Sequence, residues 1–272
     1  ITEPSLMESL RNLFQNQNSS LRIIEIKGAE LTLIRPKLDL LPAKKTPILL
    51  SARFKFTHST PNQINVNGDL SHLEIEGLSF RGTLKTILAK KTPINVDLES
   101  TSISVKNINT LTEALSKTDS IPLQFKSGQI EKIFIHLNGL MDLSDNPLKE
   151  VVIESGFKIG KLEISIPKVK KLENIPLSDV DGRGVWKDGV LNYKINGMLW
   201  GGTIESNLII NLPNLLKGSF AGTYNSATKF DKLDLYSVGF NPPIVGTANG
   251  SINTKGSLNK GTHTYGDLQI ND

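Results

Sequence analysis

Residues 182–212 read GRGVWKDGVLNYKINGMLWGGTIESNLIINL, and this stretch decides the fold class. Two dipeptides, Asp188-Gly189 and Gly201-Gly202, interrupt runs in which apolar and polar residues alternate. Such dipeptides supply the positive φ angles that two-residue hairpin turns require. The stretch therefore predicts three antiparallel strands joined by two tight turns.

The second turn also predicts a register. If Gly201 and Gly202 form it, one face of the sheet carries only apolar pairs, namely Leu199–Ile204, Ile195–Leu208, Tyr193–Ile210 and Leu191–Leu212. The other face then carries the pairs Trp200–Thr203, Met198–Glu205, Asn196–Asn207 and Asn192–Asn211. The first turn sets Trp186 against Leu191 and Gly184 against Tyr193, so that an aromatic ring covers a bare glycine. A one-residue slip would scramble both faces. We therefore expect a meander that is apolar on one side and rich in Asn on the other.

The composition of the whole chain fits a globular β protein. The 272 residues include 38% hydrophobic residues, no cysteine and a net charge of +4. The basic residues are spread out, which is typical of a solvated surface and is also compatible with attraction to anionic head groups. No signal peptide and no run of about 18 apolar residues is present. We expect the chain to be a piece of a longer protein.

The rest of the chain predicts short strands with two short helices. Residues 1–20 contain an amphipathic helix that caps the sheet, and residues 109–117 form a second helix. From Leu21 onward alternating strands are punctuated by Gly28, Pro36, Pro47 and Gly68, and later a bulge is expected at Gly160. A seam is expected near residues 142–148, and residues 229–240 are ambiguous between helix and strand. The fold class is all-β and mainly antiparallel, as an extended sheet, a sandwich or an open barrel over residues 21–272.

Motifs for catalysis are missing from the sequence. The four histidines, His58, His72, His136 and His263, have no partner at the spacing of a zinc site. No nucleophile elbow, phosphate-binding glycine loop or dinucleotide fingerprint occurs. Asp179 and Asp181 are better explained by a turn than by acid–base catalysis. We expect no enzyme activity, no cofactor, no metal and no nucleic-acid partner.

A family resemblance rests on the second half of the chain. LNYKINGMLWGGTIESNLIINL, GSFAGTYNSATKFDKLDL and VGTANGSINTKGSLN follow one another, with Trp200-Gly201-Gly202 and residues 246–250 (GTANG) in the order typical of AsmA-like proteins. The opening SSLRIIEIKGAELTLIRPKLDL is similar to that family too. The resemblance is to the AsmA- and TamB-type bridge-like lipid transfer proteins of diderm bacteria. It implies an elongated curled sheet with an open hydrophobic groove that carries phospholipid or a related lipid through the periplasm. It also implies a tether to the inner membrane by a segment absent from this chain.

The candidate groove-lining residues follow from the alternation of the strands. They are Ile94, Val96, Leu98, Leu162, Ile164, Ile166, Trp186, Leu191, Tyr193, Ile195, Leu199, Ile204, Leu208, Ile210 and Leu212. Alternating strands also build ordinary sandwich cores, so a structural or adaptor module that pairs with a partner by strand addition, including a secretion-system subunit, is the alternative. A β-fold enzyme would need a cleft that gathers two of the scattered acidic residues.

Overall fold

The computed structural model describes most of the chain from Ile23 onward. The described ranges are 23–35, 44–60, 63–75, 78–88, 91–105, 124–142, 150–165, 174–212, 222–239, 242–257 and 260–271. Several expectations lie outside these ranges: the helices in 1–20 and 109–117, most of the seam at 142–148, and Ile166.

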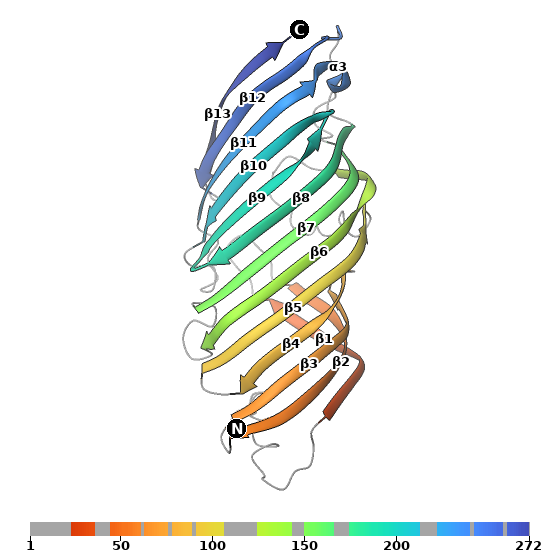
Figure 1. Ribbon diagram of the computed structural model, residues 1–272, viewed down its shortest axis with the longest axis vertical. Helices are drawn as coiled ribbons and strands as arrows, with labels where there is room; N and C mark the ends of the chain where they lie inside the picture. The colour runs from red at the N-terminus through yellow and green to blue at the C-terminus, as the bar shows by residue number, and fades with distance from the viewer. Residues whose placement is uncertain are drawn as a thin grey trace.

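The described strands form one antiparallel sheet of 13 strands, in which the spatial order equals the chain order (Figure 1). The strands are β1 (Ile23–Arg35), β2 (Lys44–Thr60), β3 (Gln63–Ile75), β4 (Leu78–Leu88), β5 (Lys91–Ser104), β6 (Gln124–Asp142), β7 (Glu150–Ser165), β8 (Ile175–Lys187), β9 (Val190–Leu199), β10 (Gly202–Asn211), β11 (Thr223–Asp234), β12 (Thr247–Ser257) and β13 (Lys260–Asn271). One short helix, α3 (Leu235–Val238), follows β11. The expected all-β antiparallel fold is confirmed.

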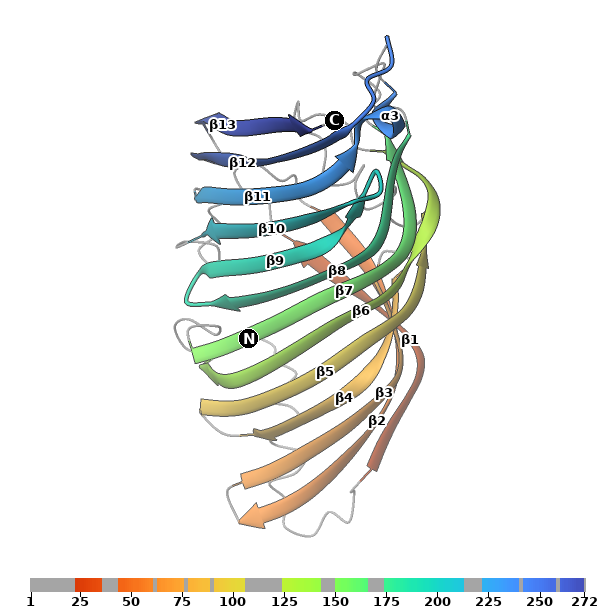
Figure 2. The ribbon, with the colours of Figure 1, turned by 45° about the horizontal axis from the view of Figure 1, so that its top comes forward.

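The sheet is curled and remains open. Its edges are β1 and β13, and each described strand between them pairs only with the strands before and after it in the chain. Figure 2 shows the strands bending along their length as they follow one another up the molecule. The described strands therefore make a single layer, and the sandwich of two packed sheets is not the architecture of this part of the chain.

The strands are longer than the punctuation by glycine and proline predicted. They contain 10 to 19 residues, because Gly28, Pro47 and Gly68 lie inside strands. Gly28 adopts a φ of 61° at a register shift between Ile26 and Ala29, so it forms a bulge and not an end. Pro47 pairs with Thr32 of β1 but lies just before β2 begins to pair with β3, so it has a paired strand on one side only.

The Asp188-Gly189 turn is confirmed. Both residues have positive φ angles, 50° and 79°, as a type I′ turn requires. Trp186 pairs with Leu191, and Gly184 pairs with Tyr193, as the sequence predicted.

The prediction that Gly201 and Gly202 form the second turn was wrong by one residue, and the register predicted from it was wrong by two residues. Trp200 and Gly201, with φ angles of 45° and 74°, form the turn. Gly202 instead belongs to β10, where a Cβ atom would lie only 2.6 Å from the backbone nitrogen of Leu233. The observed pairs are Leu199–Gly202, Gly197–Ile204, Ile195–Ser206, Tyr193–Leu208 and Leu191–Ile210 on one face, and Met198–Thr203, Asn196–Glu205, Lys194–Asn207 and Asn192–Ile209 on the other. Because side chains alternate with a period of two, this shift changes partners but leaves the residues of β9 and β10 on their expected faces. Trp200, expected on the polar face, lies in the turn and packs against the same cluster as Leu199 and Ile204.

The bulge expected at Gly160 is confirmed by the pairing of β7 with β6. The register shifts between Gly128 and Ile130, whose partners are Leu162 and Ile159. Ile159 and Leu162 have opposite parity, yet both are buried and pack in one cluster. The irregularity therefore returns the apolar residues of β7 to the same face.

The segment that was ambiguous between helix and strand contains both. β11 continues to Asp234, whose side chain accepts a hydrogen bond from the backbone N–H of Tyr236 and so caps α3. α3 ends at Gly239, which adopts the left-handed conformation with a φ of 77°.

Candidate functional site

Strand pairing carries one apolar face across the sheet. Residues that pair directly share a face, so the face can be followed from strand to strand. One such row runs through Leu98, Ile135, Ser155, Gly184, Tyr193 and Leu208 in β5 to β10. We call this side of the sheet the apolar face, and the opposite side the polar face.

Thirteen of the fifteen predicted lining residues share the apolar face. They are Ile94, Val96, Leu98, Leu162, Ile164, Trp186, Leu191, Tyr193, Ile195, Leu199, Ile204, Leu208 and Ile210. Leu212 lies just after β10, where its N–H donates to the carbonyl oxygen of Gly189 over 2.7 Å. Ile166 lies outside the described residues. The sequence thus assigned faces correctly over strands that are far apart in the chain.

Other residues of the apolar face were missed, above all in β6 and β7. Ile135 and Leu137 pair with Leu98 and Val96, so they connect the two predicted parts of the lining. Residues 133–135 are all apolar, so the sequence does not show which residues of β6 lie on which face of the sheet. The structure resolves it, because Phe134 pairs with Gly156 on the polar face.

The apolar face carries no charge over the C-terminal half of the sheet. In β8 to β13 no residue that pairing places on this face is Asp, Glu, Lys or Arg, among the described strand residues. A charge there would lack the water and counter-ions that stabilise it. This segregation is what distinguishes the two faces most clearly.

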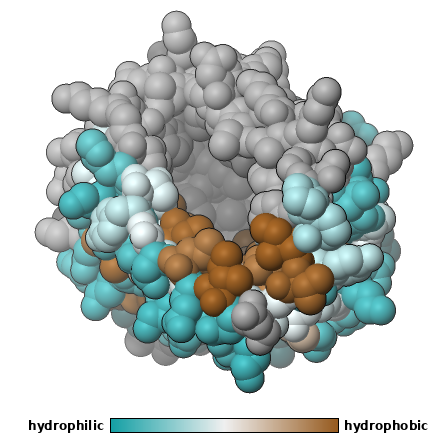
Figure 3. Space-filling view, turned by 90° about the horizontal axis from the view of Figure 1, so that it is seen from above, coloured by the Kyte–Doolittle hydropathy of each residue, from teal (hydrophilic) through white to brown (hydrophobic). Residues whose placement is uncertain are grey.

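The apolar face lies beside a hollow, and no second layer of described strands covers it. Figure 3, viewed along the long axis, shows brown hydrophobic side chains at the edge of a central hollow and teal hydrophilic ones around the outside. Leu191, Tyr193, Ile195, Leu208 and Ile210 are all half-buried. Of the predicted lining residues that the structure describes, only Leu162 and Trp186 are buried, with 4% and 9% of their surface exposed. A dry core would bury nearly all of them.

An aromatic pair occupies the middle of the apolar face. The rings of Phe157 and Tyr193 are stacked, with centroids 6.0 Å apart. Together they cover Gly182, and Tyr193 also covers Gly184. Burial raises the pKa of the Tyr193 hydroxyl, and a hydrogen bond with Ser155 lowers it by a smaller amount.

Trp186 brings an unsatisfied polar atom to the same face. Its indole Nε1–H is buried and has no hydrogen-bond partner in the part of the chain that the structure describes. Buried donors of this kind are uncommon in folded proteins. In the strand pairing, Trp186 is opposite Ile153 of β7 and Leu191 of β9.

The polar face holds the charged residues. Lys194 bridges to Glu205 over 2.7 Å, and Lys132 bridges to Glu99 over 2.7 Å. The hydrogen bond from Lys194 is the main cause that holds the pKa of Glu205 below its usual value. These pairs are exposed and contribute little to stability.

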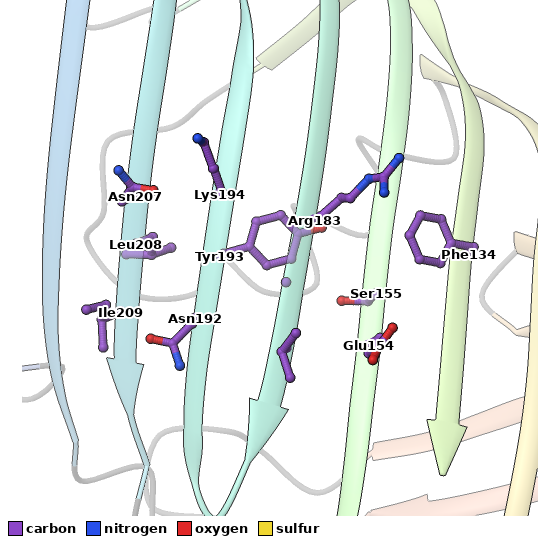
Figure 4. A pocket seen from close by; sticks show the side chains of 12 residues that line it. Phe134, Glu154, Ser155, Arg183, Asn192, Tyr193, Lys194, Asn207, Leu208 and Ile209 are labelled. Atoms are coloured by element: carbon purple, nitrogen blue, oxygen red, sulfur yellow. The ribbon is translucent and has the colours of Figure 1, made fainter.

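A depression of about 580 Å³ crosses β6 to β10 on the polar face (Figure 4). Glu154, Val185, Asn192 and Ile209 form one wall, and Phe134, Arg183, Lys194 and Asn207 form the other. Ser155, Tyr193 and Leu208 lie between these two rows, and Gly184 also contributes to the lining. The depression is a shallow furrow between two rows of mostly exposed side chains, without a constellation typical of catalysis.

No cluster of three or more potential metal ligands occurs among the described residues. In the same part of the chain, no helix has the length and hydrophobicity that a membrane crossing requires.

No protein-family model, curated protein or solved structure matches this chain. The resemblance to AsmA-like proteins therefore stays a prediction. The functional argument rests on the two faces of the sheet.

Proposed function

We propose that this chain binds lipid, with the acyl chains lying against the apolar face of the curled sheet. One observation carries the proposal: the apolar face extends from strand to strand across the sheet, is half-exposed and, in β8 to β13, is free of charge among the described strand residues. In water such a surface is unfavourable, and hydrocarbon is the ligand that covers it without needing hydrogen bonds.

The energetics favour a passive mechanism. Each methylene group that leaves water for such a face contributes about 0.8 kcal/mol, so a single acyl chain can bind through many small contributions. No bond is made or broken, and no residue is assigned a catalytic role. The polar head group stays in water at the mouth of the groove.

The resemblance suggests the setting in which such binding operates. We place the protein in the periplasm of diderm bacteria, where it carries phospholipid or a related lipid between the inner and outer membranes. A segment outside this chain then supplies the tether to the inner membrane.

Strand addition is a second candidate function, favoured by the edge strand β13. Leu268 and Ile270 on the apolar face and Tyr265 on the polar face are 62%, 52% and 61% exposed at this edge. An exposed edge can pair with a strand of another chain. Lipid-free protein that oligomerises through β13 would favour this candidate.

A quenching experiment tests lipid binding. The chain contains two tryptophans, and a Trp200→Phe variant leaves Trp186 on the apolar face as the only indole. Phospholipid with brominated acyl chains should quench its fluorescence in a saturable manner, and native mass spectrometry should show co-purified phospholipid. Protein that is free of lipid and shows no quenching at any lipid concentration overturns the proposal.

A further inference from the structure

A patch of hydroxyl groups interrupts the apolar face in the last four strands. We call it the hydroxyl patch; its members are Ser206, Ser226, Thr228, Thr254 and Thr264. Ser206 pairs with Thr228, Ser226 pairs with Thr254, and Thr254 pairs with Thr264. Leu208, which pairs with both Tyr193 and Ser226, fixes the patch on the apolar face.

Among the described N-terminal strands the hydroxyl residues of this face are not paired with one another: Thr86 pairs with Ile94, and Ser100 pairs with Phe80 and Ile133. There the apolar face carries directly paired aliphatic residues such as Leu84, Val96 and Leu137. In β10 to β13 the hydroxyls are bordered instead by two apolar areas. Tyr193 and Leu208 lie on the side of β9, and the paired residues Ile204 and Phe230 lie toward α3. The lining therefore changes from aliphatic to mixed along the long axis.

The hydroxyls retain hydrogen-bonding capacity. Ser206 and Thr228 share one bond of 2.8 Å, and Thr254 and Thr264 share one of 3.4 Å. Each bond uses one hydroxyl hydrogen, so one hydrogen in each pair is still free to donate. The side chain of Ser226 has no hydrogen-bond partner among the described residues. Ser206, Ser226, Thr228 and Thr254 are half-buried, and Thr264 is exposed.

Building on the proposed lipid binding, we propose that the hydroxyl patch binds the ester carbonyl groups of a diacyl glycerolipid. The ester carbonyls are acceptors that lie between a charged head group and two apolar tails. A serine or threonine hydroxyl donates to such an acceptor, while the uncharged face around it offers no counter-ion for a phosphate. The apolar areas on both sides of the patch then receive the two acyl chains.

The test compares two lipids that differ only at the ester. Protein with an unchanged hydroxyl patch is titrated with diacyl phosphatidylcholine and with its dialkyl ether analogue of equal chain length, which lacks the carbonyl acceptors. Affinity is read from displacement of a brominated lipid in the Trp200→Phe background. We expect the ester lipid to bind roughly fivefold tighter or more, as one or two hydrogen bonds would give.

Variants assign the preference to the patch. Ser226→Ala combined with Thr254→Val should reduce the preference for the ester lipid, because only Ser206, Thr228 and Thr264 can then donate, while Ser226→Thr alone keeps it. Thr203→Val, on the polar face of β10, is the matched control and should change nothing. Equal affinity of the protein with an unchanged hydroxyl patch for the ester and ether lipids overturns this inference but leaves lipid binding intact. Binding of neither lipid overturns both proposals.

Discussion

The ring of Tyr193 lies over Gly184, directly opposite it in the ladder between β8 and β9. A Cβ atom at position 184 would collide with that ring. The glycine therefore allows Tyr193 to lie flat against the sheet and to stack on Phe157. This packing places two stacked aromatic rings at the middle of the apolar face, where the proposed acyl chain would lie.

Gly184→Ala should consequently destabilise the protein by about 1–3 kcal/mol, as overpacking does. The reason is displacement of the Tyr193 ring, so the same change in a Tyr193→Ala background should cost less. Urea unfolding of the four proteins in this double-mutant cycle measures the coupling. Additive costs would show that the ring and the glycine do not interact.

A charge on the apolar face should impair lipid binding selectively. Leu208→Asp places a carboxylate on the half-buried lining, where an acyl chain would desolvate it. Asn207→Asp is the matched control, because Asn207 precedes Leu208 in β10 and its side chain is exposed on the polar face opposite Lys194. We expect at least a tenfold loss of brominated-lipid affinity for Leu208→Asp and little change for the control. An equal loss of expression and binding for Leu208→Asp would instead indicate a closed core.

Engineered cysteines can test the register of β9 and β10. The chain has no cysteine, so an introduced pair has no competitor. Asn196→Cys with Glu205→Cys joins directly opposed residues and should form a disulfide readily. Asn196→Cys with Asn207→Cys joins diagonal positions about 7–8 Å apart and should form it poorly. Mass spectrometry after mild oxidation shows which of the two cysteine pairs forms a disulfide. Preferential oxidation of the Asn196→Cys and Asn207→Cys pair would support the register that a Gly201-Gly202 turn predicts.

The cap of α3 predicts a pH-dependent contribution to stability. Asp234 accepts hydrogen bonds from the hydroxyl of Ser237 and from the backbone N–H of Tyr236, and the bond from Ser237 is the main cause that lowers its pKa. Because the pKa is lower in the folded state, the stabilisation is present above the unfolded-state pKa and is lost as the pH falls through the folded-state value.

Asp234→Asn should therefore lower the melting temperature near pH 7, and the difference from wild type should shrink at strongly acidic pH. Thermal unfolding followed by circular dichroism over a pH series measures it. Asp231→Asn, on the same strand but outside the cap, serves as the control. A difference that is constant with pH would rule out the carboxylate as its source.

Some residues that line the apolar face could be predicted from the sequence, and others could not. Ile94, Val96 and Leu98 alternate cleanly with Asn95, Asp97 and Glu99, so their common face was predictable. The same face in β6 was hidden, since residues 133–135 are all apolar. The hydroxyl patch was not predicted either, because Ser and Thr in a strand occur on either face of a sheet. Only the pairing with Leu208 assigns Ser226 to the apolar face.

The alternation of residues determined by itself that this protein is an antiparallel β structure with one apolar and one polar face. That information is local, and a period of two preserves it even when the register shifts by two residues. Only the tertiary structure decided the register, the continuity of strands through Gly28 and Gly68, and the single open layer. Those features depend on contacts between distant residues, such as the approach of β11 to Gly202, and on curvature that accumulates over 13 strands.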